Sequence, residues 1–165
     1  MTAHKNDADA LLQAVLSQAR AAGIPVSGAI EPQVRINTRA TTRFGRCSGS
    51  NGRFVIELSA RLLDAPEAAC RQTLAHELLH TCRGCRNHQA LWRSYAARMN
   101  AQFGYSIGRV SSCEALGLEP AGPIRYRLRC EGCGAVLTRQ RRSPLVEHPE
   151  RYRCRCGGRL IRLGE

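Results

Sequence analysis

Apolar residues near the start of the chain recur at the spacing of one helical face, and a glycine follows them where a helix C-cap is expected. The residues of this face are Leu11, Leu12, Val15, Leu16 and Ala19, and the glycine is Gly23. We therefore predict an N-terminal helix that packs through its leucine and valine side chains and carries no chemistry.

Further along the chain, alternating apolar and polar positions replace the helical pattern. Residues 34–37 alternate in this way, and residues 53–59 place every second residue, an apolar one, on a single face. Between residues 42–47 and 53–59 lies Asn51-Gly52, a pair that favours a tight hairpin turn. We predict a small antiparallel sheet in this part of the chain.

Two more helices are predicted after the sheet. Pro66 and Glu67 are typical of a helix start, and a break is expected near Gly84. The next helix is predicted from about His88 to Phe103, with Gly104 just beyond it. Its buried face is predicted to contain Leu91, Tyr95 and Met99.

The periodic pattern then fades. Residues 105–123 contain three glycines and two prolines and show little periodicity, whereas short arginine-rich strands with paired cysteines follow from Ile124. We expect a domain over residues 1–110, a linker over 111–123 and a small domain over 124–165.

Residues 76–80 read His-Glu-Leu-Leu-His, within the first of the two later helices. Histidines four residues apart lie on one helical face, about 6 Å apart along the axis, where both can bind one Zn²⁺. Glu77 stands beside the first histidine and can accept a proton from water at the metal. We predict His76 and His80 as ligands of a catalytic zinc and Glu77 as the catalytic base. The alternative is two surface histidines beside a solvated carboxylate.

His88 is the predicted third ligand. On a continuous helix it would lie about 12 Å from His80 along the axis, too far to share a metal. The helix must therefore end between them, and Gly84 can adopt the positive φ that a reversal needs. The alternative is an exposed histidine at the start of a helix.

The composition adds a strong positive charge. The 165 residues include 24 arginines, a single lysine and 13 acidic residues, and the formal net charge is +12. Guanidinium groups match the geometry of phosphates, so we expect a nucleic-acid partner. A genome rich in GC codons would raise the arginine content as well. Only eight aromatic residues are present, so any base-stacking surface must be small.

The nine cysteines, without a signal-peptide pattern, predict a cytoplasmic chain in which clustered cysteines bind metal. No apolar run approaches the roughly 18 residues of a membrane span, so no membrane partner is expected. Cys130 and Cys133 form one close pair, and Cys154 and Cys156 form another twenty residues later. This is the overall spacing of a four-cysteine zinc ribbon, with a second pair one residue shorter than usual. We predict a second, structural zinc, with a disulfide or an eroded ribbon as the alternatives.

Arginines are concentrated around these cysteines. Residues 124–165 hold 11 Arg and 4 Glu, a net charge of +7, and two runs alternate arginine with other residues. We predict that both runs are strands and that the arginines contact phosphates, the alternative being a solvated charged face. The candidates are Arg125, Arg127, Arg129, Arg139, Arg141, Arg142, Arg151, Arg153 and Arg155.

The remaining cysteines allow more than one interpretation. Cys82 and Cys85, between His80 and His88, are either a redox pair or two reduced thiols that pack the loop, the second being favoured. Cys47 is expected to behave as a small apolar residue. It has one alternative as a metal ligand, because peptide deformylases combine an upstream cysteine with the same His-Glu-x-x-His motif.

Taken together, these segments resemble the SprT-like metalloproteases, which include Spartan. The resemblance rests on His-Glu-Leu-Leu-His at 76–80, His-Gln-Ala-Leu-Trp at 88–92 and the cysteine pairs. Residues 42–48 are similar to the family's Trp-Gly-Ser-Cys-type strand, and residues 53–58 to the strand that follows it. The resemblance covers about residues 34–163.

This resemblance implies an α+β fold. The zincin-type core that it implies contains the small sheet, the helix with the two histidines and the helix after it, followed by a β zinc ribbon. The N-terminal helix lies outside the resemblance, and we expect it to complete the core. Gln89 stands where the family usually has Gly, and Phe44 where it usually has Trp. Neither residue is a ligand, so metal binding is not affected, and the departures bear only on the expected shape of the substrate loop.

In proteases of this type an extended substrate commonly lies beside an edge strand, and residues 53–59 are our candidate for that strand. Tyr95 and Tyr105 are conceivable donors to an oxyanion, although packing roles are favoured for both.

We therefore predict a zinc endopeptidase, with one catalytic and one structural Zn²⁺, that cleaves proteins bound or cross-linked to DNA in the cytoplasm, at the nucleoid if the source is bacterial. The first alternative is a non-catalytic zinc protein that binds nucleic acid. The second is another zinc hydrolase, either deformylase-like or a nuclease.

Overall fold

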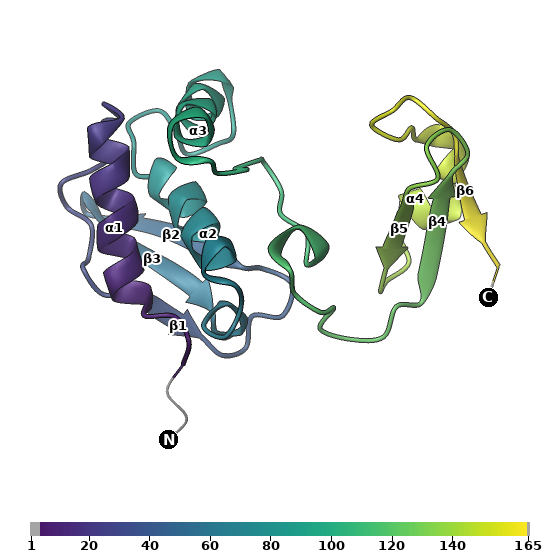
Figure 1. Ribbon diagram of the computed structural model, residues 1–165, viewed down its shortest axis with the longest axis horizontal. Coiled ribbons are helices and arrows are strands. Elements are labelled where there is room, and N and C mark those ends of the chain that lie inside the picture. Colours follow the sequence, from purple (N-terminus) through teal and green to yellow (C-terminus); the bar gives the residue numbers. More distant parts are fainter. Residues whose placement is uncertain (1–3, 165) are drawn as a thin grey trace. The chain divides into compact units, whose positions relative to one another are not determined.

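The computed structural model describes residues 4–164 and has an α+β architecture (Figure 1). The chain divides into two compact units after Glu119, a position inside the predicted linker 111–123. Each unit is described separately below. In the part of the chain that the structure describes, no helix combines the length and the apolar character that crossing a bilayer requires.

The described part of the first unit contains three α-helices: α1 (Ala8–Ala21), α2 (Glu67–Leu79) and α3 (Ala90–Phe103). Single 3₁₀ turns form at η1 (Ala60–Leu62) and η2 (Glu114–Leu116). The side chain of Asp7 caps α1 by accepting a hydrogen bond from the N–H of Ala10 at 3.0 Å. The predicted apolar face of α1 is buried, which confirms the first helix and its role in packing.

The first unit also contains a three-stranded sheet in the order β1-β3-β2, formed by β1 (Arg35–Asn37), β2 (Gly45–Ser50) and β3 (Arg53–Ser59). The predicted hairpin joins β2 to β3, and its turn residues Asn51 and Gly52 have φ of 51° and 75°. Positive φ at both positions is the geometry that an Asn-Gly pair favours.

Two expectations about this sheet are wrong. The sheet is mixed rather than antiparallel, because β1 pairs with β3 in parallel. For the same reason β3, the candidate edge strand for substrate, is the central strand, with β1 on one side and β2 on the other. The edge opposite β1 is formed by β2.

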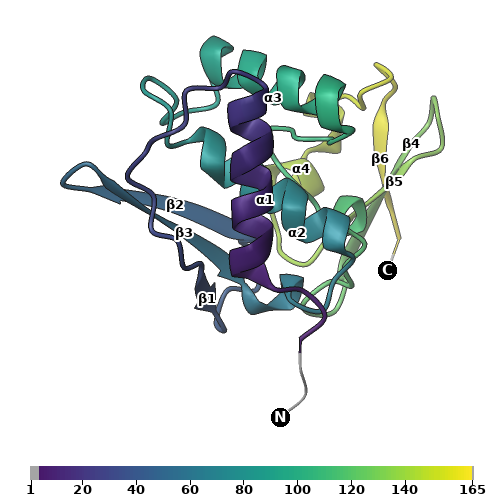
Figure 2. The same ribbon diagram turned by 60° about the vertical axis from the view of Figure 1, so that its left-hand side comes forward.

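Helix α2 is the centre of the first unit. It contacts β2 and β3 as well as α1 and α3, and Figures 1 and 2 show α1 and α2 on the same face of the sheet. The apolar core between these elements is closed to solvent. Fully buried members are Leu12, Val15, Ile56, Leu58, Leu74, Leu78 and Leu79.

Helix α3 differs from the prediction in its first residue and in which side chains it buries. It begins at Ala90 rather than His88, because residues 81–89 form an irregular turn. Leu91, predicted to be buried, is 44% exposed, whereas Trp92 is 1% exposed and is buried together with Ala96 and Met99. The buried face of α3 is therefore set by Trp92.

The second unit is built on an antiparallel sheet in the order β5-β4-β6. Its strands are β4 (Tyr126–Cys130), β5 (Val136–Arg139) and β6 (Leu160–Leu163), and a short helix α4 (Pro144–Glu147) and a 3₁₀ turn η3 (Pro149–Arg151) lie between β5 and β6. Leu128, Val146 and Leu160 form its small core.

The second predicted arginine-rich strand, residues 151–156, is largely absent. Arg151 ends η3, which starts at Pro149, and Arg153 makes only an isolated bridge with Arg159. A tight turn follows, in which the N–H of Gly157 donates to the carbonyl of Cys154 at 2.8 Å. This turn brings Cys154 and Cys156 toward the first cysteine pair, and it prevents residues 151–156 from forming the predicted strand.

Candidate metal centres

The end of α2 and the turn after it bring the three predicted histidines together. His76 and Glu77 lie in the last turns of α2, and His80 is the C-cap residue. The chain then reverses through residues 81–89, where Gly84 has φ of 80°, and returns His88 to the end of α2.

The imidazoles of His76, His80 and His88 converge on one point. Each offers a ring nitrogen, and these nitrogens all lie within 4.8 Å of one another. The Nε2 atoms of His76 and His88 are 3.0 Å apart. Three imidazole nitrogens grouped in this way form a candidate donor set for a single Zn²⁺.

Main-chain carbonyls orient two of these rings. The Nδ1 atom of His76 lies 2.9 Å from the carbonyl oxygen of Gly108, and that of His80 lies 2.7 Å from the carbonyl oxygen of Cys85. An Nδ1–H that donates to a carbonyl leaves Nε2 with a free lone pair, which is the tautomer a metal needs. Burial, reinforced by the neighbouring His80 and His88, lowers the pKa of His76 to about 4. His76 is therefore neutral at pH 7, and the donor set fits zinc.

Trp92 forms a wall behind the histidines. Its indole ring is 4.6–5.6 Å, centroid to centroid, from all three imidazoles and is stacked on His80 with an interplanar angle of 24°. The buried indole limits the orientations that the imidazoles can adopt. No role was predicted for it, although its position four residues after His88 was part of the family resemblance.

Glu77 is 9% exposed as a residue, and its side chain packs against the backbone of β2 at Gly45. A Cβ atom at Gly45 would lie 2.8 Å from Cγ and 2.9 Å from Oε1 of Glu77, so any larger residue there would displace the Glu77 side chain. Burial raises the pKa of Glu77 to about 7, against the opposing effects of the backbone N–H of Cys47 and the charge of Arg43. Gly45 thus lets the carboxylate lie between α2 and β2.

The histidines and Glu77 open into a cleft of about 1190 Å³. Its lining comes from β2, the β2–β3 hairpin, the end of α2 and residues 81–88. The tyrosines considered as oxyanion donors are not part of this lining: the hydroxyl of Tyr105 donates to Oε1 of Gln18 at 2.5 Å, and Tyr95 packs against the core.

Cys47 lines the cleft, but its sulfur is not among the grouped ligand atoms of the described residues. Burial, together with the nearby Glu77, raises the pKa of the Cys47 thiol to about 12. This arrangement does not favour the deformylase-like alternative. Cys82 and Cys85 are buried in the turn, and the carbonyl oxygen of Cys85 orients His80.

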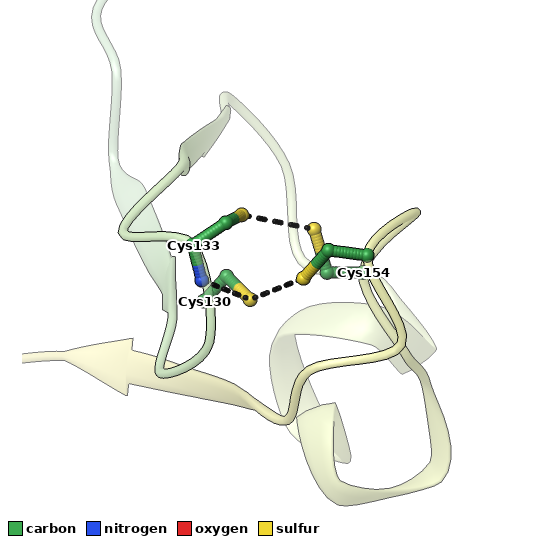
Figure 3. A group of neighbouring side chains, drawn as sticks. Cys130, Cys133 and Cys154 are labelled. Carbon is green, nitrogen blue, oxygen red and sulfur yellow. Dashed lines mark hydrogen bonds between the residues drawn. The ribbon is translucent and has the colours of Figure 1, made fainter.

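In the second unit the four predicted cysteines form another cluster, with all sulfur atoms within 4.8 Å of one another (Figure 3). The Sγ atoms of Cys130 and Cys156 are 3.5 Å apart, and those of Cys133 and Cys154 are 3.6 Å apart. A disulfide bond is about 2.05 Å long, whereas two thiolates on a tetrahedral zinc lie about 3.8 Å apart. The cluster is compatible with a zinc ribbon.

Backbone amides and glycines surround these sulfurs. The N–H groups of Gly132 and Cys133 donate to Sγ of Cys130 at 3.3 and 3.5 Å, and these contacts favour the thiolate. Mainly through the amide of Cys133, they lower the pKa of Cys130 to about 6. A Cβ atom at Gly158 would lie only 2.6 Å from the same sulfur. The shortened second pair therefore still allows the close backbone approach that a thiolate site requires.

The predicted phosphate-contacting arginines of the second unit are all exposed. Arg127 and Arg129 lie on β4 and Arg139 ends β5, whereas the others lie in loops and turns. Within residues 4–164, only Arg142 of this set forms an ion pair, with Glu147 at 3.2 Å. The other eight guanidinium groups have no carboxylate partner in the described structure, but they do not form two regular strand faces.

The first unit therefore contains a candidate metal centre of the His-Glu-x-x-His class, formed by three convergent imidazoles beside a buried carboxylate. A comparison of the sequence with models of known families agrees with this class of site: the model described as the SprT-like family matches residues 13–112. The chain belongs to the SprT-like family, which is linked to metalloprotease activity. A search of curated proteins gave no match.

Proposed function

We propose that this protein is a zinc-dependent endopeptidase with a zincin-type catalytic core in its first unit. The single observation that carries the proposal is the cluster of His76, His80 and His88, oriented by main-chain carbonyls and placed beside the buried Glu77. Zinc bound there would polarise a substrate carbonyl and acidify a water molecule.

In this mechanism Glu77 accepts a proton from the attacking water and then delivers it to the leaving amine, so that hydroxyl and hydrogen are added across the cleaved peptide bond. The position of the carboxylate is fixed by its contact with Gly45 and by the main chain at Cys47. Trp92 and the two carbonyl acceptors keep the imidazoles in place during the reaction.

Strand β2 is the proposed docking edge for the substrate. It borders the cleft that contains Glu77, and β1 does not cover it. An extended peptide that pairs with β2 would gain main-chain hydrogen bonds and would pass the histidines. This replaces β3, the strand expected from the sequence.

We further propose that the substrates are proteins bound or cross-linked to DNA and that the protein works in the cytoplasm, at the nucleoid in a bacterial cell. The support is the second unit, whose exposed arginines give residues 124–165 a net charge of +7 around a candidate structural zinc site. Such a surface would hold the enzyme on phosphates near its substrate.

The test is to incubate the purified full chain with a basic DNA-binding protein, with and without DNA, and to follow cleavage by gel and mass spectrometry. We expect cleavage that increases when DNA is present and is abolished in Glu77→Gln. A Glu77→Gln variant that cleaves as well as the parent would falsify the mechanism. Cutting of naked nucleic acid without proteolysis would instead indicate a nuclease.

Metal content provides an independent test. We expect two zinc ions per chain, one lost in His76→Ala and the other in Cys130→Ser, as measured by elemental analysis of the dialysed protein. A chain that holds one zinc, bound only by the cysteines, would support the non-catalytic alternative.

A further inference from the structure

Arginine side chains surround the opening of the catalytic cleft. Arg46 on β2, Arg53 in the hairpin and Arg83 and Arg86 in the turn between His80 and His88 all line it, and all four are exposed. Glu77 is the only acidic side chain among the described lining residues. The rim of the cleft is therefore strongly positive.

Acidic neighbours neutralise only part of this charge. Arg53 forms an ion pair with Glu31 at 2.7 Å. The carboxylate near Arg46 is Glu57, which already binds Arg43 at 2.9 Å. Arg83 and Arg86 form no ion pair within residues 4–164.

The position of these arginines indicates what they meet. They lie along the same cleft as Glu77 and the three histidines, so a peptide chain in position for hydrolysis must pass them. A nucleic acid in the same cleft would displace the peptide from Glu77. The side chains of the peptide on either side of the scissile bond are therefore the groups that the arginines face.

We propose that the cleft selects peptide segments with Asp or Glu close to the scissile bond, and that Arg83 and Arg86 are the main determinants of this preference. The inference rests on the proposed peptidase function and adds the substrate class. It agrees with DNA-bound substrates: phosphates repel acidic segments, so these face away from the DNA. Cleavage would then occur on the accessible side of the bound protein.

The expected effect is moderate because the guanidinium groups are exposed. An exposed ion pair contributes little, so each added acidic residue should raise kcat/KM about two- to fivefold over its amide counterpart. Raising the salt concentration from about 0.05 to 0.5 M should remove most of the difference, because screening shortens the range of the interaction.

The experiment uses the full zinc-loaded chain and quenched fluorescent peptides of one sequence, with the positions around the scissile bond occupied by Glu, Gln or Lys. We expect the order Glu, then Gln, then Lys in kcat/KM. In Arg83→Gln/Arg86→Gln this order should collapse, so that the Glu and Gln peptides are cleaved with equal kcat/KM. The matched control is Arg20→Gln/Arg39→Gln, which removes two exposed arginines outside the cleft and should keep the full preference.

Equal cleavage of the Glu and Gln peptides by the parent protein would overturn the specificity but leave the peptidase intact. A complete absence of Glu77-dependent cleavage in any protein or peptide would overturn the proposed function as well. Adding a short DNA duplex tests the remaining possibility, which is that these arginines bind nucleic acid instead of peptide. If DNA inhibits the parent but not Arg83→Gln/Arg86→Gln, and no acidic preference exists, the arginines bind nucleic acid and the inference is wrong.

Discussion

Gly45→Ala is the sharpest test of how the fold positions the catalytic carboxylate. The added methyl group would lie 2.8 Å from Cγ of Glu77 and 2.8 Å from Cγ2 of Thr73, about 0.6 Å short of the 3.4 Å at which ordinary contact begins. Strand β2 is held to β3 by a full ladder on one side, so the side chains of α2 must give way. We expect Glu77 to be displaced by roughly half an ångström or more.

The size of the effect follows from that displacement. A misplacement of about 1 Å can cost about 100-fold in rate, so kcat should fall between about 10- and 100-fold. Overpacking should lower the free energy of unfolding by about 1–3 kcal/mol. The metal site should be unaffected, because no histidine is among the three atoms nearest the new methyl group.

The assay combines kcat on a protein substrate, zinc content and thermal unfolding. Gly28→Ala is the matched control, since a Cβ there meets nothing within 4 Å and its activity and stability should stay near the parent's. A second variant, Gly45→Ala/Thr73→Ser, removes one of the two clashing groups and should recover stability while kcat stays low. If Gly45→Ala is folded and keeps its kcat within about twofold, the reasoning about Glu77 is refuted.

Three further predictions concern the two metal centres and the basic surface. His88→Ala should weaken Co²⁺ binding by more than roughly 10- to 100-fold, which is the loss expected when a ligand loses only its hydrogen-bond partner. Co²⁺ binding can be followed by quenching of the fluorescence of Trp92, the single tryptophan. Unchanged quenching would argue against His88 as a ligand. Gly158→Ala should lower zinc retention by the cysteine cluster, measured by release to a chromogenic chelator, because its Cβ would lie 2.6 Å from Sγ of Cys130; retention equal to the parent's would contradict this. Arg127→Gln/Arg129→Gln should weaken binding to duplex DNA and reduce the slope of log K against log salt by about two; a slope that does not change would exclude both residues from phosphate contact.

Local patterns predicted the parts of the fold that depend on neighbouring residues. The spacing of the apolar residues in α1, the Asn51-Gly52 turn and the position of His76, Glu77 and His80 on one helix all follow from short-range periodicity and turn chemistry. The four cysteines of the second unit could be grouped because their spacing allows a hairpin to bring two close pairs together.

Features that depend on distant partners were not predicted. The central position of β3 depends on its parallel pairing with β1, which a short exposed segment such as Arg35–Asn37 does not indicate. The phase of α3 depends on the packing of Trp92 against the histidines, so the helical pattern correctly included Met99 but placed Leu91, instead of Trp92, on the buried face. The second arginine run was predicted as a strand because alternation does not reveal where a turn interrupts it.

Gly45 could have been assigned a role from the sequence only with difficulty. The glycine was visible as part of the segment that resembles the family's strand, but its contact with Glu77 joins residues 32 positions apart. A glycine in a strand is a signal of close approach by another group, and here that group is the catalytic carboxylate.

The carbonyl oxygens that orient His76 and His80 belong to the main chain of Gly108 and Cys85. Every amino acid supplies such an oxygen, so the identity of residues 85 and 108 is not fixed by this task; only the path of the backbone is. A substitution at residue 85 or 108 therefore keeps the acceptor as long as the backbone keeps its path, whereas an insertion or deletion of a single residue would move the acceptor away. For the orientation of these two rings, the lengths of the loops matter more than the side chains at residues 85 and 108.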